Sequence, residues 1–81
     1  MAASFTRYLS GRDVVEFTFD FNGKEHEGLI SGEALDDHVG MKNRTAADAQ
    51  VAFEMKPETI EAAAMKLVRR GREPHIGTSD L

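Results

Sequence analysis

The chain has 81 residues, of which 41% are hydrophobic and 30% charged. This composition is too apolar for a disordered tail and too charged for a membrane protein. Because the chain is short, we expect one small domain spanning 1–81. Its formal net charge of −4 opposes non-specific attraction to nucleic acid or to anionic lipid. Because the sequence contains no cysteine, disulfides and thiolate chemistry are excluded.

The first strong pattern is the alternation of apolar and polar side chains over residues 14–21, which predicts a half-buried β-strand. Asn22-Gly23 follows directly, and both residues tolerate the positive φ of a two-residue type I′ turn. A returning strand should therefore pair Phe21 with Lys24, Phe19 with His26, Phe17 with Gly28, and Val15 with Ile30. The same register places Asp20 opposite Glu25 on the face turned to water. Tyr8 and Leu9 indicate part of a preceding strand.

Helical signals follow the hairpin. Ser31 is a suitable N-cap for a helix of about two turns that ends at Gly40. Thr45 to Asp48 has the form of a capping box, and apolar residues then keep helical spacing as far as Leu67. Pro57 lies inside this segment and disfavours helical geometry at the residue before it. We predict either a long helix kinked at Pro57 or two abutting helices.

The chain closes with a helix stop and a short strand. Gly71 and Pro74 end the long helix, and residues 75–78 could add a strand beside the hairpin. The predicted fold class is α+β with two layers: a β-hairpin, a short helix, a long helix and a C-terminal strand. The long helix should pack on one face of a small, mainly antiparallel sheet and leave the other face partly wet.

Metal-ligand side chains cluster in the predicted short helix, as Glu33, Asp36, Asp37 and His38. Two carboxylates four residues apart give a hard cation too few oxygen ligands, and zinc needs more nitrogen or sulfur ligands. A solvated helix face is the favoured interpretation. His26 falls on the predicted core face, where it would be either a functional imidazole or, more often, a histidine at the sheet margin. His75 would approach it only through strand pairing that the sequence does not predict.

Serines and threonines offer no activated nucleophile, because they lie at turns or chain ends without a strained elbow motif. The sequence therefore predicts no enzyme, with no catalytic residue, metal or cofactor. Metal-dependent catalysis stays as a minor alternative, which would require Glu33, Asp37 and a histidine to converge.

One dense basic cluster stands at the end of the long helix: Lys66, Arg69, Arg70 and Arg72. Cations at this position complement the negative end of the helix without any partner. The alternative is contact with phosphate, nucleic acid or an acidic protein surface, although the sequence shows no neighbouring aromatic residue that would stack bases. Both interpretations stay open.

Two further features bear on partners. Met41, Met55 and Met65 are expected to fill the core rather than form a binding stripe. An open sheet of three or four strands leaves unpaired edges, and a second copy of the chain could satisfy them. A homodimer through a sheet edge, or a protein partner on the uncovered sheet face, is therefore a reasonable hypothesis.

Several segments together resemble a known family. These are Ser4-Phe5, the glycine turn at Gly23, the run LISGEALDDHVG, and AFEMKPETIEAAA with its Phe53. They are similar to the small bacterial proteins grouped as domain of unknown function 1488, over nearly the whole chain. The chain departs from that pattern at Gly28, Val39 and Pro57. The resemblance implies a compact α+β domain in the bacterial cytoplasm and carries over no catalytic or binding residue.

The preferred functional hypothesis is a small non-enzymatic interaction or regulatory module that acts through protein contacts. No apolar run approaches the ~20 residues of a membrane span, and residues 1–6 lack the features of a signal peptide. We therefore expect a cytoplasmic protein without membrane contact.

Overall fold

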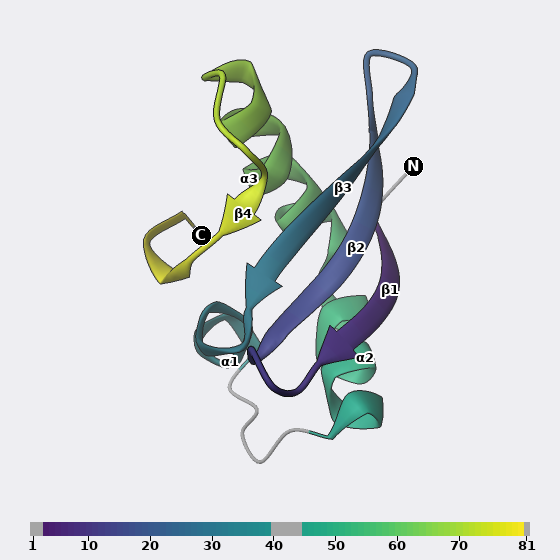
Figure 1. Cartoon of the computed structure of the whole chain (residues 1–81), viewed down its shortest axis with the longest axis vertical. Helices are drawn as coiled ribbons and strands as arrows, with labels where there is room; N and C mark the ends of the chain where they lie inside the picture. Colours follow the sequence, from purple (N-terminus) through teal and green to yellow (C-terminus); the bar gives the residue numbers. More distant parts are fainter. Residues whose placement is uncertain (1–2, 40–44, 81) are drawn as a thin grey trace.

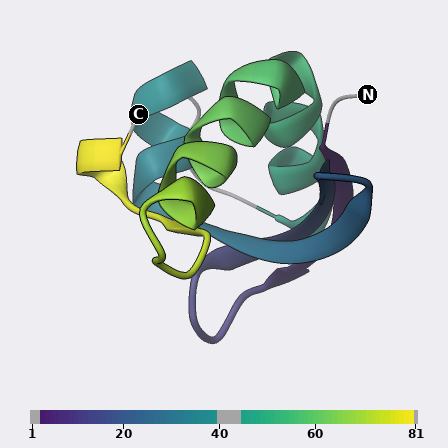
Figure 2. The same ribbon diagram turned by 90° about the horizontal axis from the view of Figure 1, so that it is seen from above.

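In the computed structural model, which describes residues 3–39 and 45–80, four strands form one sheet in the order β1-β2-β3-β4. Three helices gather on one side of this sheet and leave its other side uncovered (Figures 1 and 2). The chain therefore has the two-layer α+β architecture that its sequence predicts. The elements are β1 (Ser4–Leu9), β2 (Val14–Phe21), β3 (Lys24–Ser31), α1 (Gly32–Val39), α2 (Ala46–Met55), α3 (Pro57–Arg69), β4 (His75–Ile76) and the 3₁₀ turn η1 (Thr78–Asp80).

The predicted hairpin is confirmed in its register. Strands β2 and β3 are antiparallel, and the pairs include Phe21 with Lys24, Phe19 with His26, Phe17 with Gly28, Val15 with Ile30, and Asp20 with Glu25. Asn22 and Gly23 adopt φ angles of 54° and 79°, which is the left-handed geometry that a type I′ turn requires. The turn and the alternating pattern together fix which side chains enter the core.

The two outer strands differ from each other. β1 runs antiparallel to β2, and its register shifts between Phe5 and Arg7, as in a β-bulge. β4 is only two residues long and runs parallel to β3, so the sheet is mixed. The backbone N–H of Leu29 donates to the carbonyl oxygen of Pro74 at 3.0 Å, just before this strand. The predicted C-terminal strand therefore exists, in a shorter form.

The helix starts follow the capping signals. The Ser31 hydroxyl accepts from the Ala34 backbone N–H at 3.1 Å, and Thr45 and Asp48 form both hydrogen bonds of a capping box, each 3.2 Å long. Gly40, the expected end of α1, lies outside the described residues. No helix within residues 3–39 and 45–80 has the length and apolar character needed to cross a membrane.

Pro57 separates two helices instead of kinking one. Lys56 has φ −145° and ψ 59°, outside the helical region, and Pro57 is the first residue of α3. Proline is suited to this first position, where its missing N–H is not needed, and it disfavours helical geometry in the preceding residue. Of the two predicted outcomes, two abutting helices are therefore confirmed, with a break at Lys56.

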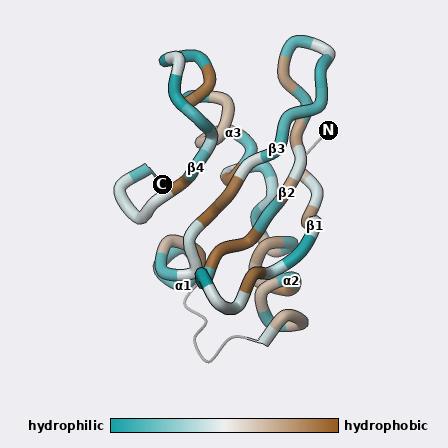
Figure 3. The backbone as a smooth tube through the Cα atoms, viewed as in Figure 1, coloured by the Kyte–Doolittle hydropathy of each residue, from teal (hydrophilic) through white to brown (hydrophobic). Residues whose placement is uncertain are grey.

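The core lies between the sheet and the helices, where alternate side chains of β2 and β3 are buried with Ile76 of β4. Figure 3 shows hydrophobic stretches of the backbone, coloured brown, along β2 and β3. Phe53 of α2 is fully buried, with its ring centroid 5.4 Å from that of Phe17 and 6.0 Å from that of Phe5. It therefore joins α2 to both β1 and β2. The largest fully buried side chains are Val15, Phe17, Ile30, Leu35, Phe53 and Ile60.

Candidate functional site

The uncovered side of the sheet, called the outer face below, is the largest surface that the fold leaves without a second layer (Figure 2). It carries the alternate strand residues that do not enter the core, because successive side chains of a strand point to opposite sides. From the strand register these residues are Ser4, Arg7, Leu9, Val14, Glu16, Thr18, Asp20, Glu25, Glu27, Leu29, Ser31 and His75.

One row of this face crosses all four strands. Arg7 pairs with Glu16, Glu16 with Leu29, and Leu29 with His75. The Arg7 Nε donates to Glu16 Oε1 at 2.6 Å. This hydrogen bond, then the charge of Glu16 and to a smaller degree that of Glu27, raises the pKa of Arg7 above its ordinary value. The guanidinium of Arg7 is therefore already held by a carboxylate.

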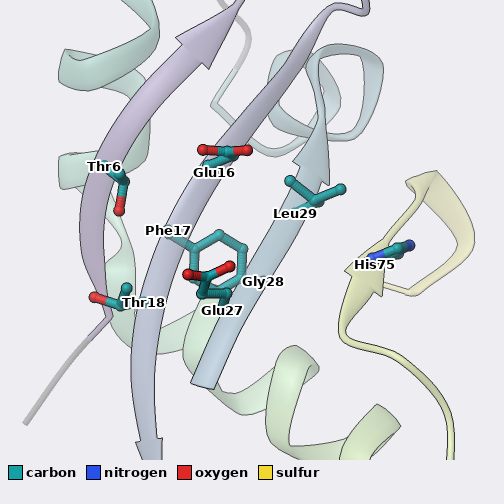
Figure 4. A pocket seen from close by; sticks show the side chains of 8 residues that line it. All are labelled: Thr6, Glu16, Phe17, Thr18, Glu27, Gly28, Leu29 and His75. Atoms are coloured by element: carbon teal, nitrogen blue, oxygen red, sulfur yellow. The ribbon is translucent and has the colours of Figure 1, made fainter. Parts of the chain in front are cut away.

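A cavity of about 240 Å³ opens on the outer face beside this row. Its lining comes from all four strands, as Figure 4 shows, and consists of Thr6, Glu16, Phe17, Thr18, Glu27, Gly28, Leu29 and His75. The absence of a side chain at Gly28 leaves room for the Phe17 ring on the core side, where a Cβ would lie 2.5 Å from the Phe17 Cζ. The cavity offers carboxylates, hydroxyls and one apolar wall from Leu29.

Negative charge dominates the outer face. It carries four carboxylates, from Glu16, Asp20, Glu25 and Glu27, against the guanidinium of Arg7 and that of Arg12, which lies at its edge beside Val14 and Ser31. Apart from Glu16, none of these acids forms an ion pair with a side chain in the described part of the chain. Such a surface attracts cationic groups and repels anions.

The predicted basic cluster stands at the C-terminal end of α3 and directly after it. All four of its members, Lys66, Arg69, Arg70 and Arg72, are exposed. Lys66 lines a shallow cavity with Thr59 and Asp80, whereas Arg69 lies over the ring of Phe21, with its Cζ 5.8 Å from the ring centroid. Gly71, at φ 74°, ends α3, and the Arg72 N–H returns to the Leu67 carbonyl oxygen at 3.0 Å, as in a Schellman motif.

The contact between Arg69 and Phe21 corrects the view that this cluster has no aromatic neighbour. Phe21 also meets His26 edge to face at 5.9 Å between centroids, and His26 stacks on Phe19 at 5.6 Å. His26 is thus a half-buried residue at the margin of the sheet, packed against two phenylalanine rings. No sequence signal joins residue 69 to residue 21, because only the packing of α3 on the hairpin brings them together.

The acidic segment of α1 does not gather ligands from elsewhere. Within residues 3–39 and 45–80, no group of three or more His, Asp or Glu is arranged to hold a metal ion. His38 and Asp37 line a shallow depression with Ala34 and Thr78, while His26 packs in the hairpin and His75 lies on the outer face. Glu33 and Asp37 are exposed, whereas Asp36 and His38 are half-buried, so only part of the cluster forms a solvated helix face.

The remaining candidate surfaces are smaller. Met65 packs against the core, as expected. Met55 is 57% exposed, so the expectation that Met55 fills the core is wrong. Met41 lies outside the described residues. Val51, one turn before Met55, is 54% exposed. At the sheet edges, β1 is bulged and β4 has two residues, and both features oppose the addition of another strand.

Comparison with known proteins gives one match. The family model described as "Protein of unknown function (DUF1488)" matches residues 4–79. No curated protein and no solved structure matches the chain.

Proposed function

Because the chain belongs to the DUF1488 family of proteins of unknown function, a description that assigns no chemistry, we propose that it is a non-catalytic protein-interaction module that binds through its outer face. The observation that carries this proposal is the distribution of the helices, all of which cover one side of the sheet (Figure 2). The other side keeps the half-buried apolar residues Leu9, Val14 and Leu29 beside a carboxylate-rich cavity. Apolar centres with polar surroundings are common in protein interfaces.

A non-catalytic role is supported by the positions of the hydroxyl groups. Ser31 and Thr45 accept hydrogen bonds as helix caps, and no histidine of the described chain hydrogen-bonds to a serine or threonine hydroxyl. A nucleophilic site needs such a base within reach. We place the module in the bacterial cytoplasm, because its sequence resembles bacterial proteins and contains no cysteine.

The outer face is tested by blocking it. Thr18 lies at its centre, so Thr18→Arg adds a bulky cation there, and the immobilised variant should recover a native-lysate partner at least tenfold less well than the wild type. Ala62→Arg on the exposed side of α3 is the matched control and should bind like the wild type. Equal recovery by both variants, or a monomer in sedimentation that recovers no partner above background, refutes the proposal.

A second candidate function is binding of single-stranded nucleic acid at the end of α3, and the contact of Arg69 with Phe21 favours it. Arginine and aromatic groups together hold phosphates and bases in such sites. The exposed Arg70 adds a cation for which the described chain supplies no ion-pair partner. The acids of the hairpin, Asp20 and Glu25, lie on the opposite side of the strands from Phe21.

Gel retardation of a short single-stranded RNA at low salt tests this candidate. The wild type should bind, and Arg69→Ala with Arg70→Ala should abolish retardation and, with it, the dependence of binding on salt. Arg12→Ala with Lys56→Ala removes the same charge elsewhere and should leave binding almost unchanged. A wild-type protein that retards neither RNA nor DNA disproves the idea.

A further inference from the structure

We infer that the partner of the outer face is a basic segment of another protein, and that one lysine or arginine side chain of that segment enters the cavity lined by Glu16, Glu27 and Leu29. This inference rests on the proposed function, because it names the class of partner for the same surface. It depends on three features of the face: its charge, the size of the cavity and the chemistry of the cavity walls.

Charge favours a cationic partner. Glu16 is the one outer-face acid that forms an ion pair within the described chain, through its 2.6 Å contact with Arg7, whereas Glu27 acts on Arg7 only through its charge. Glu27, exposed and paired across the sheet with Thr18, stands at the cavity without such a partner. Complementary charge across an interface favours the correct partner and its orientation and opposes acidic competitors.

Size favours a single side chain over a metabolite. The cavity measures about 240 Å³, below the range of about 300 to 1,000 Å³ that is usual for small-molecule pockets. It also opens onto a sheet surface, so a ligand held there alone would remain largely in contact with water. A side chain that belongs to a bound segment can be held in such a small cavity, because the rest of the segment also contributes to the affinity.

The walls of the cavity match the two parts of a long basic side chain. Leu29 and the bare backbone of Gly28 offer an apolar surface to its methylene groups, and Glu27 offers a carboxylate to its charged head (Figure 4). Lysine and arginine commonly pack their stems along apolar surface while the head stays at a polar boundary. The hydroxyls of Thr6 and Thr18 supply additional acceptors for the N–H groups of that head.

An NMR titration of the ¹⁵N-labelled full chain tests this assignment. The probe is an end-blocked peptide of alternating lysine and serine, and a peptide of the same length with glutamate in place of lysine is the comparison. The lysine peptide should shift the backbone amides of Glu16, Thr18, Glu27 and Leu29, whereas the glutamate peptide should not. Added salt should weaken the interaction, because exposed charges are screened.

Glu27→Gln removes the charge while keeping the shape of the side chain, and it should weaken binding of the lysine peptide about threefold to fivefold, as for one exposed ion pair. Glu58→Gln in α3 loses the same charge on the helical layer and should bind like the wild type. Equal binding of both peptides, shifts confined to other surfaces, or a Glu27→Gln variant that binds normally overturns the inference. If Thr18→Arg still abolishes recovery of the native partner, the proposed function survives that result.

Discussion

Replacing Phe53 with alanine should lower the free energy of unfolding by about 3 to 5 kcal/mol, the usual cost of deleting a buried phenylalanine ring. Phe53 is fully buried and contacts the rings of both Phe5 and Phe17. The alanine variant leaves a cavity where α2 meets the sheet. A chain of this length has a total stability of about 4 to 12 kcal/mol, so the loss is a large part of the whole. Urea denaturation monitored by circular dichroism measures it.

Val51→Ala is the matched control, because Val51 stands on the same helix and is 54% exposed. Its effect should stay within about 0.5 kcal/mol. Should Phe53→Ala fail to fold, Phe53→Leu provides a milder variant that keeps part of the lost volume. A Phe53→Ala protein that unfolds at the wild-type urea concentration would show that α2 does not pack on the sheet through this ring.

A methyl group at Gly28 should destabilise the protein by about 1 to 3 kcal/mol, the usual cost of overpacking a core. The added Cβ would lie 2.5 Å, 2.8 Å and 3.1 Å from three ring carbons of Phe17. That ring is almost completely buried and also contacts Phe19 and Phe53, so it has little space into which it can move. The urea midpoint of Gly28→Ala should fall while the slope of the transition stays unchanged.

Gly11→Ala controls for the general effect of adding a methyl group to a glycine, because no atom lies within 4 Å of the new carbon. It should change stability by no more than about 0.5 kcal/mol. Combining Gly28→Ala with Phe17→Leu should recover part of the loss, since the smaller side chain makes room. The two substitutions should therefore be coupled by about 0.5 kcal/mol or more. Strict additivity would contradict the steric explanation.

The hairpin was predictable because its signals are local. Asn22-Gly23 admits few turn geometries, and the alternation from Val15 to Phe21 leaves one register that buries the aromatic side chains. Thr45 and Asp48 likewise form their capping box within one helical turn. At Lys56 the sequence left two outcomes open, and the backbone angles there decide for two helices.

Features that depend on distant segments could not be predicted in the same way. The position of Arg69 over Phe21 requires the packing of α3 against the hairpin. The bulge between Phe5 and Arg7 has no glycine to mark it, yet it brings Arg7 opposite Glu16. The parallel pairing of His75 with Leu29 depends on the path of the chain after α3. These three contacts build both candidate binding surfaces, which explains why sequence patterns alone do not identify a function.

The row from Arg7 to His75 takes its two ends from the first and last strands of the chain. The imidazole of His75 joins this row only through the parallel pairing of β4 with β3. A partner that contacts all four strands along this row would therefore require β4 to be paired with β3. Removal of β4 would take His75 from the row and Ile76 from the core, so recognition and stability should be lost together.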